Sequence, residues 1–584
     1  WLKTWVATDW SARYPGNTSV QNGLSQHFDR LLALPFNYPL NQPLIAKARQ
    51  VLRSESLASV VYRMLREQAD GLAPYSFDQH LGPQSQVFNG ADYVIPGFYT
   101  QQGYQQYFSV KGAALVSDIL RDNWVLGEGN TLSAMDMRKL MVELEQLYFR
   151  DYATQWGEAI GQLTLQPFTA ASEGADQLAA LTSANSAIVQ LLIEVRENTR
   201  FPSFIDELPV PTEGAETGAA KKLGALAGTA TATIAKAADT LAAKLPDNAK
   251  QALQRRFEPL HRLLDENNAP TATLTAALQG LNDVQQQLAS LARASAPDQA
   301  AFDMAKLRMG GQRDALSHLR QAAQRLPRPL SGWFEGVAED TWSLELDNAY
   351  HFINQRYQRE LYSFYDRAIK QRYPFSAHSS SDVALNDFRE FFRAQGLSER
   401  FFDSYMRPFV SGEAGNYRLR SIDGRSLPVS KAYFDQVAAA QVIRQGFFAQ
   451  NPAEPLVQFT LEPYSLDPAV SRAELRFGNQ SLDYRHGPIV PITLQWPTEA
   501  ENGRSSLVLD KMSGRPVGIE KSTGPWSLFR LLDLMTVEYL SGRDVMVLKA
   551  DVGGMRANYL LMSQRTPNPF DLSVLRSFRL PEQL

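Results

Sequence analysis

The sequence contains no cysteine, which excludes disulfides, thiolate catalysis and cysteine-ligated zinc. This composition suits an oxidising compartment, although cytosolic proteins can lack cysteine too. No run of about 18 apolar residues occurs, the minimum length for a helix that crosses a membrane. No charged-then-apolar leader is present either. We therefore expect a soluble segment of a longer protein, with any membrane anchor upstream of Trp1.

The sequence also lacks a large excess of charge of either sign. The 58 basic and 62 acidic residues leave a formal net charge of only -4, so no overall field attracts nucleic acid or an anionic membrane. The hydrophobic fraction of 44% is typical of a folded protein. A length of 584 residues predicts three or more domains of ~100 to 200 residues each.

Local motifs for common chemistry are absent. The sequence has no Gly-x-x-x-x-Gly-Lys-Ser/Thr phosphate loop, no His-Glu-x-x-His zinc helix and no Gly-x-Ser-x-Gly elbow. The histidines are scattered rather than spaced as metal ligands: His27, His80, His261, His318, His351, His378 and His486. We therefore predict no catalytic residues, no metal site and no cofactor, and a protein that is not an enzyme.

A peptidoglycan hydrolase is the main enzymatic alternative, because two carboxylates suffice to cleave a glycosidic bond. Glu194 and Glu197 lie three residues apart, and Glu143 and Glu145 are also close in sequence. Neither pair has a neighbouring feature that would shift a pKa. Solvated helix faces are the favoured interpretation of both pairs.

A passive peptidoglycan-binding module is a third class, and it would use exposed aromatic rings. Trp496 and Trp526 are conceivable platforms for a sugar. Their alternating and helical sequence settings favour packing in a core instead.

Helical periodicity dominates residues 1–201, which we predict to form a helical domain. One predicted helix carries an apolar stripe at three- and four-residue steps: Leu140, Leu144, Leu147, Tyr148, Tyr152 and Trp156. Another runs from Ser186 to Asn198. Residues 202–250 are rich in Ala and Gly with little apolar bulk, so they predict a flexible insertion.

Helical periodicity returns over residues 251–451, the second predicted helical region. Between Tyr350 and Arg372, one predicted face holds Ile353, Tyr357, Leu361, Phe364 and Ala368. The other side carries Arg356, Arg359, Arg367, Lys370 and Arg372, a mixture that could also bind nucleic acid. A packed stripe with a solvated basic face is favoured, because no recognition module accompanies it.

A period of two begins after Pro455, where Val457, Phe459 and Leu461 alternate with polar residues. Further predicted strands cover Ala473–Phe477, Ile492–Trp496, Ser506–Leu509, Val545–Ala550, Asn558–Ser563 and Leu575–Leu580. A short helix around Trp526 interrupts them. Residues 452–584 therefore predict an antiparallel, immunoglobulin-like β-sandwich with one inserted helix. The fold class is α+β multidomain, a mostly α-helical body followed by this sandwich.

Several short segments stand out along the chain: Ile95-Pro96-Gly97-Phe98-Tyr99-Thr100 with Gly103-Tyr104, Tyr148-Phe149-Arg150-Asp151-Tyr152 with Trp156, Tyr373-Pro374-Phe375 with Asp382-Val383-Ala384-Leu385, Asp387-Phe388, Phe391-Phe392, Gly396-Leu397, Phe401-Phe402 and Pro408-Phe409-Val410, Thr493-Leu494-Gln495-Trp496-Pro497, and Gly524-Pro525-Trp526-Ser527-Leu528-Phe529-Arg530-Leu531-Leu532-Asp533. In this order they resemble segments of the IcmF/TssM family of type VI secretion. The resemblance covers nearly the whole chain except the Ala/Gly-rich insertion.

This resemblance implies a periplasmic segment of a bacterial inner-membrane protein. In the family, such a segment bridges toward an outer-membrane lipoprotein, TssJ, assembles with the inner-membrane protein TssL and associates with itself into a ring. The expected function is therefore a structural scaffold of the type VI secretion membrane core complex. No nucleic-acid partner is expected.

We predict the lipoprotein contact on loops between strands of the sandwich. The candidate partner-binding residues lie in three turn-like segments: Arg485, His486 and Gly487, then Asn502 and Arg504, then Gly514 and Arg515. Ordinary turns are the alternative interpretation at each position.

Overall fold

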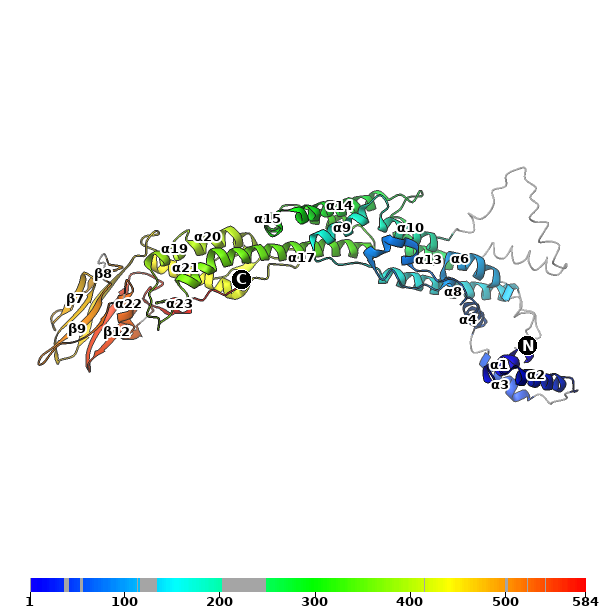
Figure 1. Ribbon diagram of the computed structural model, residues 1–584, viewed down its shortest axis with the longest axis horizontal. Coiled ribbons are helices and arrows are strands. Elements are labelled where there is room, and N and C mark those ends of the chain that lie inside the picture. The colour runs from blue at the N-terminus through cyan, green and yellow to red at the C-terminus, as the bar shows by residue number, and fades with distance from the viewer. Residues whose placement is uncertain are drawn as a thin grey trace. The chain divides into compact units, whose positions relative to one another are not determined.

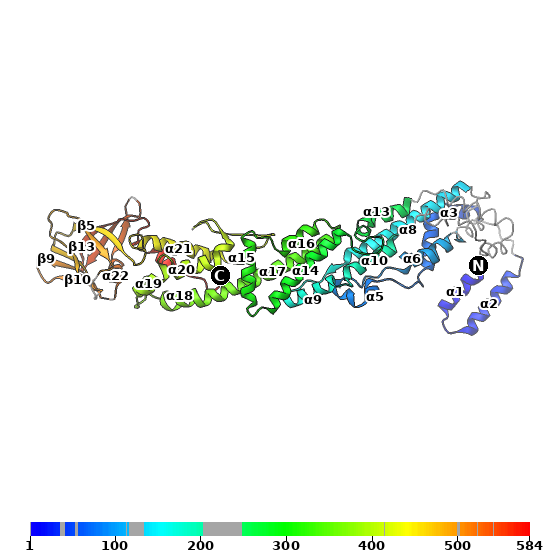
Figure 2. The ribbon, with the colours of Figure 1, turned by 90° about the horizontal axis from the view of Figure 1, so that it is seen from above.

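The computed structural model describes residues 2–35, 41–52, 56–112, 114–115, 134–201, 248–413, 415–498, 503–522, 524–540 and 542–584. Most of the predicted insertion, residues 202–247, lies outside this set. The chain forms two compact units. Figures 1 and 2 label many of the helices and strands that make them up. Unit 1 contains residues 1–82, 90–162 and 192–262, and unit 2 contains residues 83–89, 163–191 and 263–584. The predicted domain boundaries at 201, 250 and 451 stay a prediction.

Unit 1 is built from helices. Their bounds are α1 (Leu2–Arg13), α2 (Thr18–Leu32), α3 (Gln42–Leu52), α4 (Leu57–Gln68), α5 (Phe77–Leu81), η2 (Gly97–Tyr99), α6 (Gln101–Gly103), η3 (Tyr104–Phe108), α8 (Ala134–Gln162) and α13 (Asn248–His261). Helix α10 (Ala187–Thr199) is divided between the units at Leu191. The predicted stripe of α8 is confirmed, since five of its six members are buried and Leu147 is half-buried.

The core of unit 1 is aromatic and hydrogen-bonded. Tyr148 on α8 donates to the carbonyl of Phe98 at 2.7 Å, and the indole of Trp156 donates to the carbonyl of Tyr99 at 2.7 Å. Tyr62 on α4 donates to Asp151 at 2.8 Å. These bonds satisfy the polar ends of rings that are otherwise enclosed. Two of the segments that resemble the family therefore meet in one core.

The helical part of unit 2 begins with a bundle. Its elements are η1 (Gly82–Val87), β1 (Phe88–Asn89), β2 (Thr164–Leu165), α9 (Ala171–Thr182), α14 (Ala272–Arg293), α15 (Pro297–Met309), α16 (Ala315–Ala323) and α17 (Leu330–Arg356). Helix α14 buries Leu274, Leu281 and Leu288 at seven-residue intervals, so one face packs against its neighbours. Asp314 caps α16 by accepting from the backbone N–H of Ser317 at 2.9 Å.

The helix predicted over Tyr350–Arg372 exists as a continuation of α17. It passes through η5 (Tyr357–Tyr362), a π-helical turn, and α18 (Ser363–Ala368). A π turn adds a residue to the local period, and the buried position after it is Tyr365, whereas the predicted Phe364 is only half-buried. On the other side, Arg356 pairs with Glu360 and Lys370 pairs with Asp366, which favours the solvated interpretation of the basic face.

Shorter elements follow before the sandwich: α19 (Leu385–Phe392), α20 (Leu397–Phe401), η6 (Phe402–Met406), η7 (Arg407–Phe409), β3 (Val410–Ser411), β4 (Arg418–Leu419) and α21 (Lys431–Phe447). Ser430 caps α21 by accepting from the N–H of Tyr433 at 3.4 Å. Helices α19 and α21 pack against each other. They provide the surface on which the sandwich sits.

The predicted antiparallel sandwich is confirmed. Its elements are β5 (Val457–Leu466), β6 (Val470–Phe477), β7 (Gln480–Tyr484), β8 (Ile492–Trp496), β9 (Ser505–Lys511), β10 (Val517–Lys521), α22 (Ser527–Leu532), β11 (Thr536–Tyr539), β12 (Val545–Val552) and β13 (Met555–Ser563). Sheet A has the order β10-β9-β6-β7 and sheet B the order β11-β12-β13-β5-β8. The first strand pairs with β13 and β8, which refines the immunoglobulin-like expectation, because there the first strand pairs with the second.

The strand prediction fails at Leu575–Leu580. Residues Ser573–Ser577 form helix α23, and the chain then runs without a strand partner to Leu584. Leu575 and Phe578 are both buried at a three-residue spacing, which suits a helical turn better than a strand. The sequence analysis also missed β7, β10 and β11, which are short and mostly solvent-facing.

Within the described residues, no single helix combines the length and the apolar composition that a bilayer crossing requires. Helices α9 and α10 meet that test only when taken together, and the break between them is bent by 44°. This is a statement about length and composition alone.

Candidate partner-binding surface and the joint beneath it

The sandwich is fixed to the helices of unit 2 through a buried ion pair. Arg530 on α22 lies 2.5 Å from Asp382, and both side chains are only 12% exposed. The guanidinium also stacks 4.0 Å from the ring centroid of Tyr373, whose hydroxyl donates to Asp533 at 2.7 Å. A mostly buried charge pair is stable only when its geometry and remaining hydrogen bonds are good. We call the contact that residues 373–392 and Phe447 make with Trp496, Gly503 and residues 524–533 the joint.

Aromatic rings fill the joint. Trp526 is fully buried and contacts the rings of Phe388, Phe447 and Trp496 at centroid distances of 5.2, 6.1 and 4.7 Å. Its indole N–H donates to the carbonyl of Val383 at 2.8 Å. The helical region and the sandwich thus share one core at the joint.

Close backbone approach in the joint requires glycine at two positions. A Cβ atom on Gly503 would lie 1.8 Å from the carbonyl oxygen of Gly524, and one on Gly524 would lie 2.8 Å from Asp382 Oδ2. Gly524 also has a positive φ of 57°, which other residues adopt only at a cost.

The last residues form a strap that returns from the sandwich to the helices. Phe578 is fully buried, and Tyr357 donates to the carbonyl of Pro581 at 2.5 Å. Tyr350 donates to the carbonyl of Leu584 at 2.9 Å, and the N–H of Leu584 donates to Asn354 at 3.2 Å. The strap is therefore a second connection between the two parts of unit 2.

The predicted partner-binding residues separate into two groups on sheet A. Arg485, His486 and Gly487 follow β7, and His486 Nε2 lies 2.6 Å from the carbonyl oxygen of Val470 at the start of β6. Because Val470 pairs with Lys511, the turn that holds Gly514 and Arg515 lies at this same end, which we call the free end. All five of these residues are exposed.

Arg504 lies at the opposite end of sheet A. It precedes β9, its carbonyl accepts from the N–H of Gly478 at 3.0 Å, and its side chain pairs with Glu520 at 2.6 Å. This is the end that carries the joint. Asn502 lies outside the described residues. The three predicted segments therefore do not form one surface.

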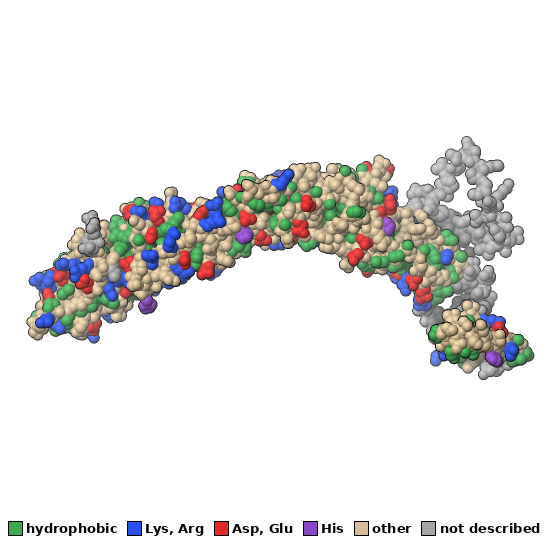
Figure 3. Space-filling model, in the orientation of Figure 1, with side chains coloured by type: hydrophobic (Ala, Val, Ile, Leu, Met, Phe, Trp, Pro, Cys, Tyr) green, Lys and Arg blue, Asp and Glu red, His purple; other side chains and the backbone are tan. Residues whose placement is uncertain are grey.

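Exposed apolar residues near the free end were missed. Met512, Ile489 and Val490 are 64%, 53% and 61% exposed. They flank the turns that sequence analysis selected for their Gly and Arg residues, and apolar exposure is not visible from a turn motif. Figure 3 shows basic and acidic side chains interspersed over the sandwich rather than gathered by sign.

Ion pairs cover the outer face of sheet A. Arg472 lies 2.7 Å from Asp483 and 3.5 Å from Asp510. Burial opposes ionisation of Asp483, but hydrogen bonds from Arg485 and Arg472 outweigh it and lower the pKa of this carboxyl. Exposed pairs of this kind add little stability, and they leave the face hydrophilic.

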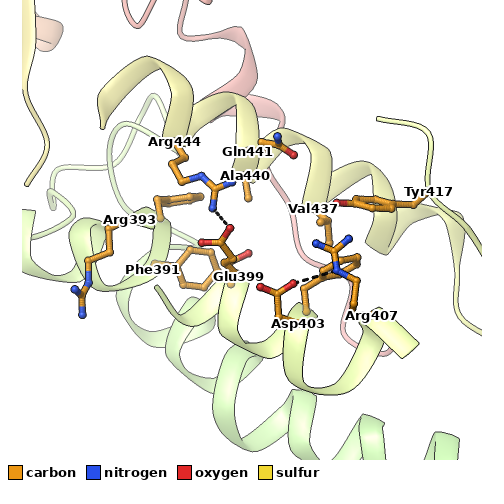
Figure 4. A pocket seen from close by; sticks show the side chains of 13 residues that line it. Phe391, Arg393, Glu399, Asp403, Arg407, Tyr417, Val437, Ala440, Gln441 and Arg444 are labelled. Atoms are coloured by element: carbon orange, nitrogen blue, oxygen red, sulfur yellow. Dashed lines mark ion pairs between the residues drawn. The ribbon is translucent and has the colours of Figure 1, made fainter. Parts of the chain in front are cut away.

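A pocket opens between α20, η6 and α21 (Figure 4). Glu399 pairs with Arg444 across the opening, and Asp403 lies 3.4 Å from Arg407. The ring of Phe391 and the side chain of Val437 are also part of the lining. Its carboxylates face guanidinium groups, so this pocket presents paired charges and no activated nucleophile.

One ionisable cluster is buried in the α14–α17 bundle. Glu345 is 1% exposed and accepts from Gln287, and Arg308 pairs with Asp314 and Asp423. Burial raises the pKa of Glu345 to about 7, while the hydrogen bond from Gln287 opposes the shift. Glu345 and Arg308 are enclosed, and the partly exposed carboxylates of the cluster, Asp314 and Asp423, are both paired with Arg308.

The enzymatic alternatives gain no support from the geometry. Glu194 accepts from Tyr75 at 2.9 Å, and Glu197 is exposed. Trp496 and Trp526 are fully buried, so core packing is confirmed and neither ring can serve as a sugar platform. Among the residues that the structure describes, no three His, Asp or Glu side chains are grouped to hold a metal ion.

Comparison with known families gives three matches in chain order. Residues 1–200 match the model IcmF-related, described as intracellular multiplication and human macrophage-killing. Residues 348–453 match the type VI secretion protein IcmF helical domain, and residues 459–565 match the type VI secretion protein IcmF C2-like domain.

Individual proteins agree with these models. The type VI secretion system component TssM1 of Pseudomonas aeruginosa is 27% identical over 598 residues, covering 100% of this chain and 53% of that protein. The chain thus spans about half the length of this relative.

Two solved structures share the fold. One is titled type VI secretion system membrane core complex, with a TM-score of 0.65 and 20% identity over 91% of this chain and 99% of that one. The other is titled type VI membrane complex, with a TM-score of 0.59 and 19% identity over 90% and 93%. The three family models, which match in order along the chain, and the TssM1 relative lead to one conclusion: the chain belongs to the IcmF/TssM family.

Proposed function

We propose that this chain is a non-enzymatic scaffold of the type VI secretion membrane core complex. In this proposal it lies in the periplasm and bridges the inner membrane to the outer-membrane lipoprotein TssJ. It also assembles with TssL and with further copies of itself. The family assignment and the titles of the two structures with the same fold support this role.

The joint is the observation that carries the proposal. A bridge keeps its two ends at a fixed separation only if the domain that binds the partner, here the sandwich, is held firmly on the helices beneath it. The Asp382–Arg530 pair, the enclosed ring of Trp526 and the strap ending at Leu584 all serve that purpose. Residues that resemble the family signature are therefore used for packing rather than for arranging reactive groups around a substrate.

We place the lipoprotein contact at the free end of the sandwich, around Arg485, His486, Gly487, Gly514 and Arg515. Exposed apolar side chains next to charged ones are typical of protein-binding surfaces. Arg504 lies at the joint end and is engaged with Glu520, so we exclude it from the proposed contact and use it as a matched control.

Titration calorimetry of the whole chain with the soluble part of TssJ tests this placement. The double variant R485E/R515E is expected to weaken binding by about tenfold or more, because two rim charges are reversed. The single variant R504E is expected to bind like the wild type. Equal binding by all three proteins would refute the free end as the contact.

Absence of any binding by the wild-type chain would refute the bridge itself. Removing the sandwich after Asn451 is a poorer experiment than these point variants. That truncation would also remove Trp526 and Phe578, which lie in the core shared with the helices, so a loss of binding could follow from a damaged body.

A further inference from the structure

The four edge strands of the sandwich are protected to different degrees. Sheet A ends in β10 and β7, and sheet B ends in β11 and β8. An edge strand presents unpaired N–H and C=O groups that can template another strand, and native proteins usually block it. Each edge here carries a charged pair or a side-chain cap, and the edges differ in how much apolar surface remains exposed.

The edge of β8 is capped by a side chain. The amide of Gln480 donates to the carbonyl oxygen of Gln495 at 2.7 Å and accepts from the N–H of Gln495 at 2.8 Å. Both outward backbone groups at the centre of the edge are thereby satisfied. Pro491 and Pro497 flank the strand, and proline cannot extend a ladder.

The edges of sheet A are blunted by charge. On β7, Asp483 is held by Arg472 and Arg485. On β10, Glu520 is paired with Arg504 and Lys521 follows directly. Charged side chains on a short edge strand disfavour addition of another strand.

The edge of β11 also carries a charged pair, Glu538 with Lys549, and the guanidinium of Arg543 lies 5.3 Å from the ring centroid of Tyr539. It differs from the other three edges in its exposed apolar side chains. Every residue of β11 is exposed, with Val537 at 37% and Tyr539 at 38%, and Leu534 and Leu540 beside it at 52% and 42%. Within the described part of the chain, β11 has a strand partner on one side only, β12. Four large apolar side chains therefore surround this edge, on which Glu538 carries the charge.

The register shows which backbone groups point outward. The N–H of Leu540 donates to the carbonyl oxygen of Val545 at 3.1 Å, and Tyr539 lies opposite Met546. Hydrogen-bonded pairs alternate with non-bonded pairs in an antiparallel ladder. Val537 and Tyr539 consequently direct their N–H and C=O groups away from β12, two residues apart, as the repeat of an added strand requires.

We propose that β11 is a docking site for an extended segment of another protein, which adds to sheet B as a further strand. The segment carries apolar side chains opposite Val537 and Tyr539 and a basic residue opposite Glu538. Strand addition takes its affinity from backbone bonds and its specificity from alternate side chains. This proposal is independent of the lipoprotein contact at the free end.

Charge decides against a second copy of this chain as the occupant. If β11 paired with β11 of a second molecule through both outward-facing residues, Val537 of each molecule would lie opposite Tyr539 of the other. Glu538 would then lie opposite Glu538 of the second molecule. Like charges directly opposite each other destabilise a strand pair. Lys549 on β12 already pairs with Glu538. A Lys or Arg on the added strand would therefore give a row of alternating charges across the three strands, with Glu538 between two basic residues.

Selection of displayed random peptides of about ten residues on the whole immobilised chain tests the proposal. Enriched peptides are expected to alternate apolar residues with Lys or Arg, and to protect the amides of Val537 and Tyr539 from hydrogen exchange. The variant V537P removes one outward N–H without touching the β12 ladder. V537P should lower the affinity of the chain for these peptides by about tenfold or more, whereas the control V537T should leave that affinity unchanged.

A second variant keeps the test valid if V537P folds poorly. Repeating the selection on E538K should shift the enriched residue from basic to acidic. No enrichment, protection elsewhere, or indifference to both V537P and E538K would overturn the proposal. Concentration-dependent dimers of the wild type that V537P abolishes would assign the edge to a second copy and overturn the occupant proposed here.

Discussion

The joint end and the free end of the sandwich use the same kinds of side chain in opposite ways. At the joint, Trp526 and Trp496 are enclosed and Arg530 is paired with Asp382. At the free end, Met512 is open to solvent and Arg485 pairs with the exposed Asp483. The difference separates residues that hold the module in place from residues available to a partner.

The largest expected effect is at the joint core. Replacing Trp526 by Ala should destabilise unit 2 by about 4 kcal/mol, because it leaves a cavity among three aromatic rings. Urea unfolding followed by circular dichroism measures this loss. The matched change Met512→Ala at the free end should stay within about 0.5 kcal/mol. Similar losses from the two variants would remove the distinction between the ends.

The ion pair of the joint gives the next effect. Arg530→Met alone should cost about 3 kcal/mol, because it leaves Asp382 buried without its partner. Adding Asp382→Leu should restore most of that stability, since two apolar groups can replace a buried pair. Thermal unfolding of both variants and the wild type tests this, and a double variant no better than the single one would contradict it.

The raised pKa of Glu345 predicts that the stability of the helical bundle depends on pH. Burial raises its pKa to about 7, so its stabilising contribution is complete below the unfolded value near 4.5 and is lost as pH rises through 7. The free energy of unfolding should fall by about 2 kcal/mol between about pH 5 and pH 8 from this group alone.

His261 in unit 1 contributes with the opposite sign, since burial lowers its pKa to about 4. Its contribution is present above its unfolded value and is lost as pH falls. The measurement is therefore the gap between wild type and Glu345→Gln across this pH range. A gap that does not change with pH would exclude Glu345 as the titrating group.

The smallest effect concerns the edges. Gln480→Ala removes the cap of β8 and should cost about 1 kcal/mol, the usual value of a hydrogen bond. Amide exchange at Gln495 should accelerate while exchange at Val537 stays unchanged. Unaltered protection of Gln495 would show that the side chain does not guard this edge.

Secondary structure could be predicted from the sequence where burial of one face gave the apolar residues a regular spacing. The alternation of Val457, Phe459 and Leu461 predicted β5, and all three are buried. It failed where tertiary context took over, as at Tyr365, which a π turn places in the core, and at Phe578, which packs on helices rather than in a sheet.

The candidate site was less predictable, for a geometric reason. Turn residues indicate loops, but the end of a sheet on which each loop lies depends on strand register. Arg504 and Arg515 look equivalent in sequence and lie at opposite ends of sheet A. The edge strand β11 escaped detection because its alternation of polar and apolar residues covers only four positions, and the exposure of such a short run depends on the fold.

One distance measurement tests the central claim, that the joint holds the sandwich rigidly on its helices. The absence of cysteine allows unique spin labels through Arg359→Cys on η5 and Ser513→Cys at the free end. Pulsed electron spin resonance should give a single narrow distance distribution, which Trp526→Ala broadens. A broad distribution in the labelled protein without that change would contradict a rigid scaffold.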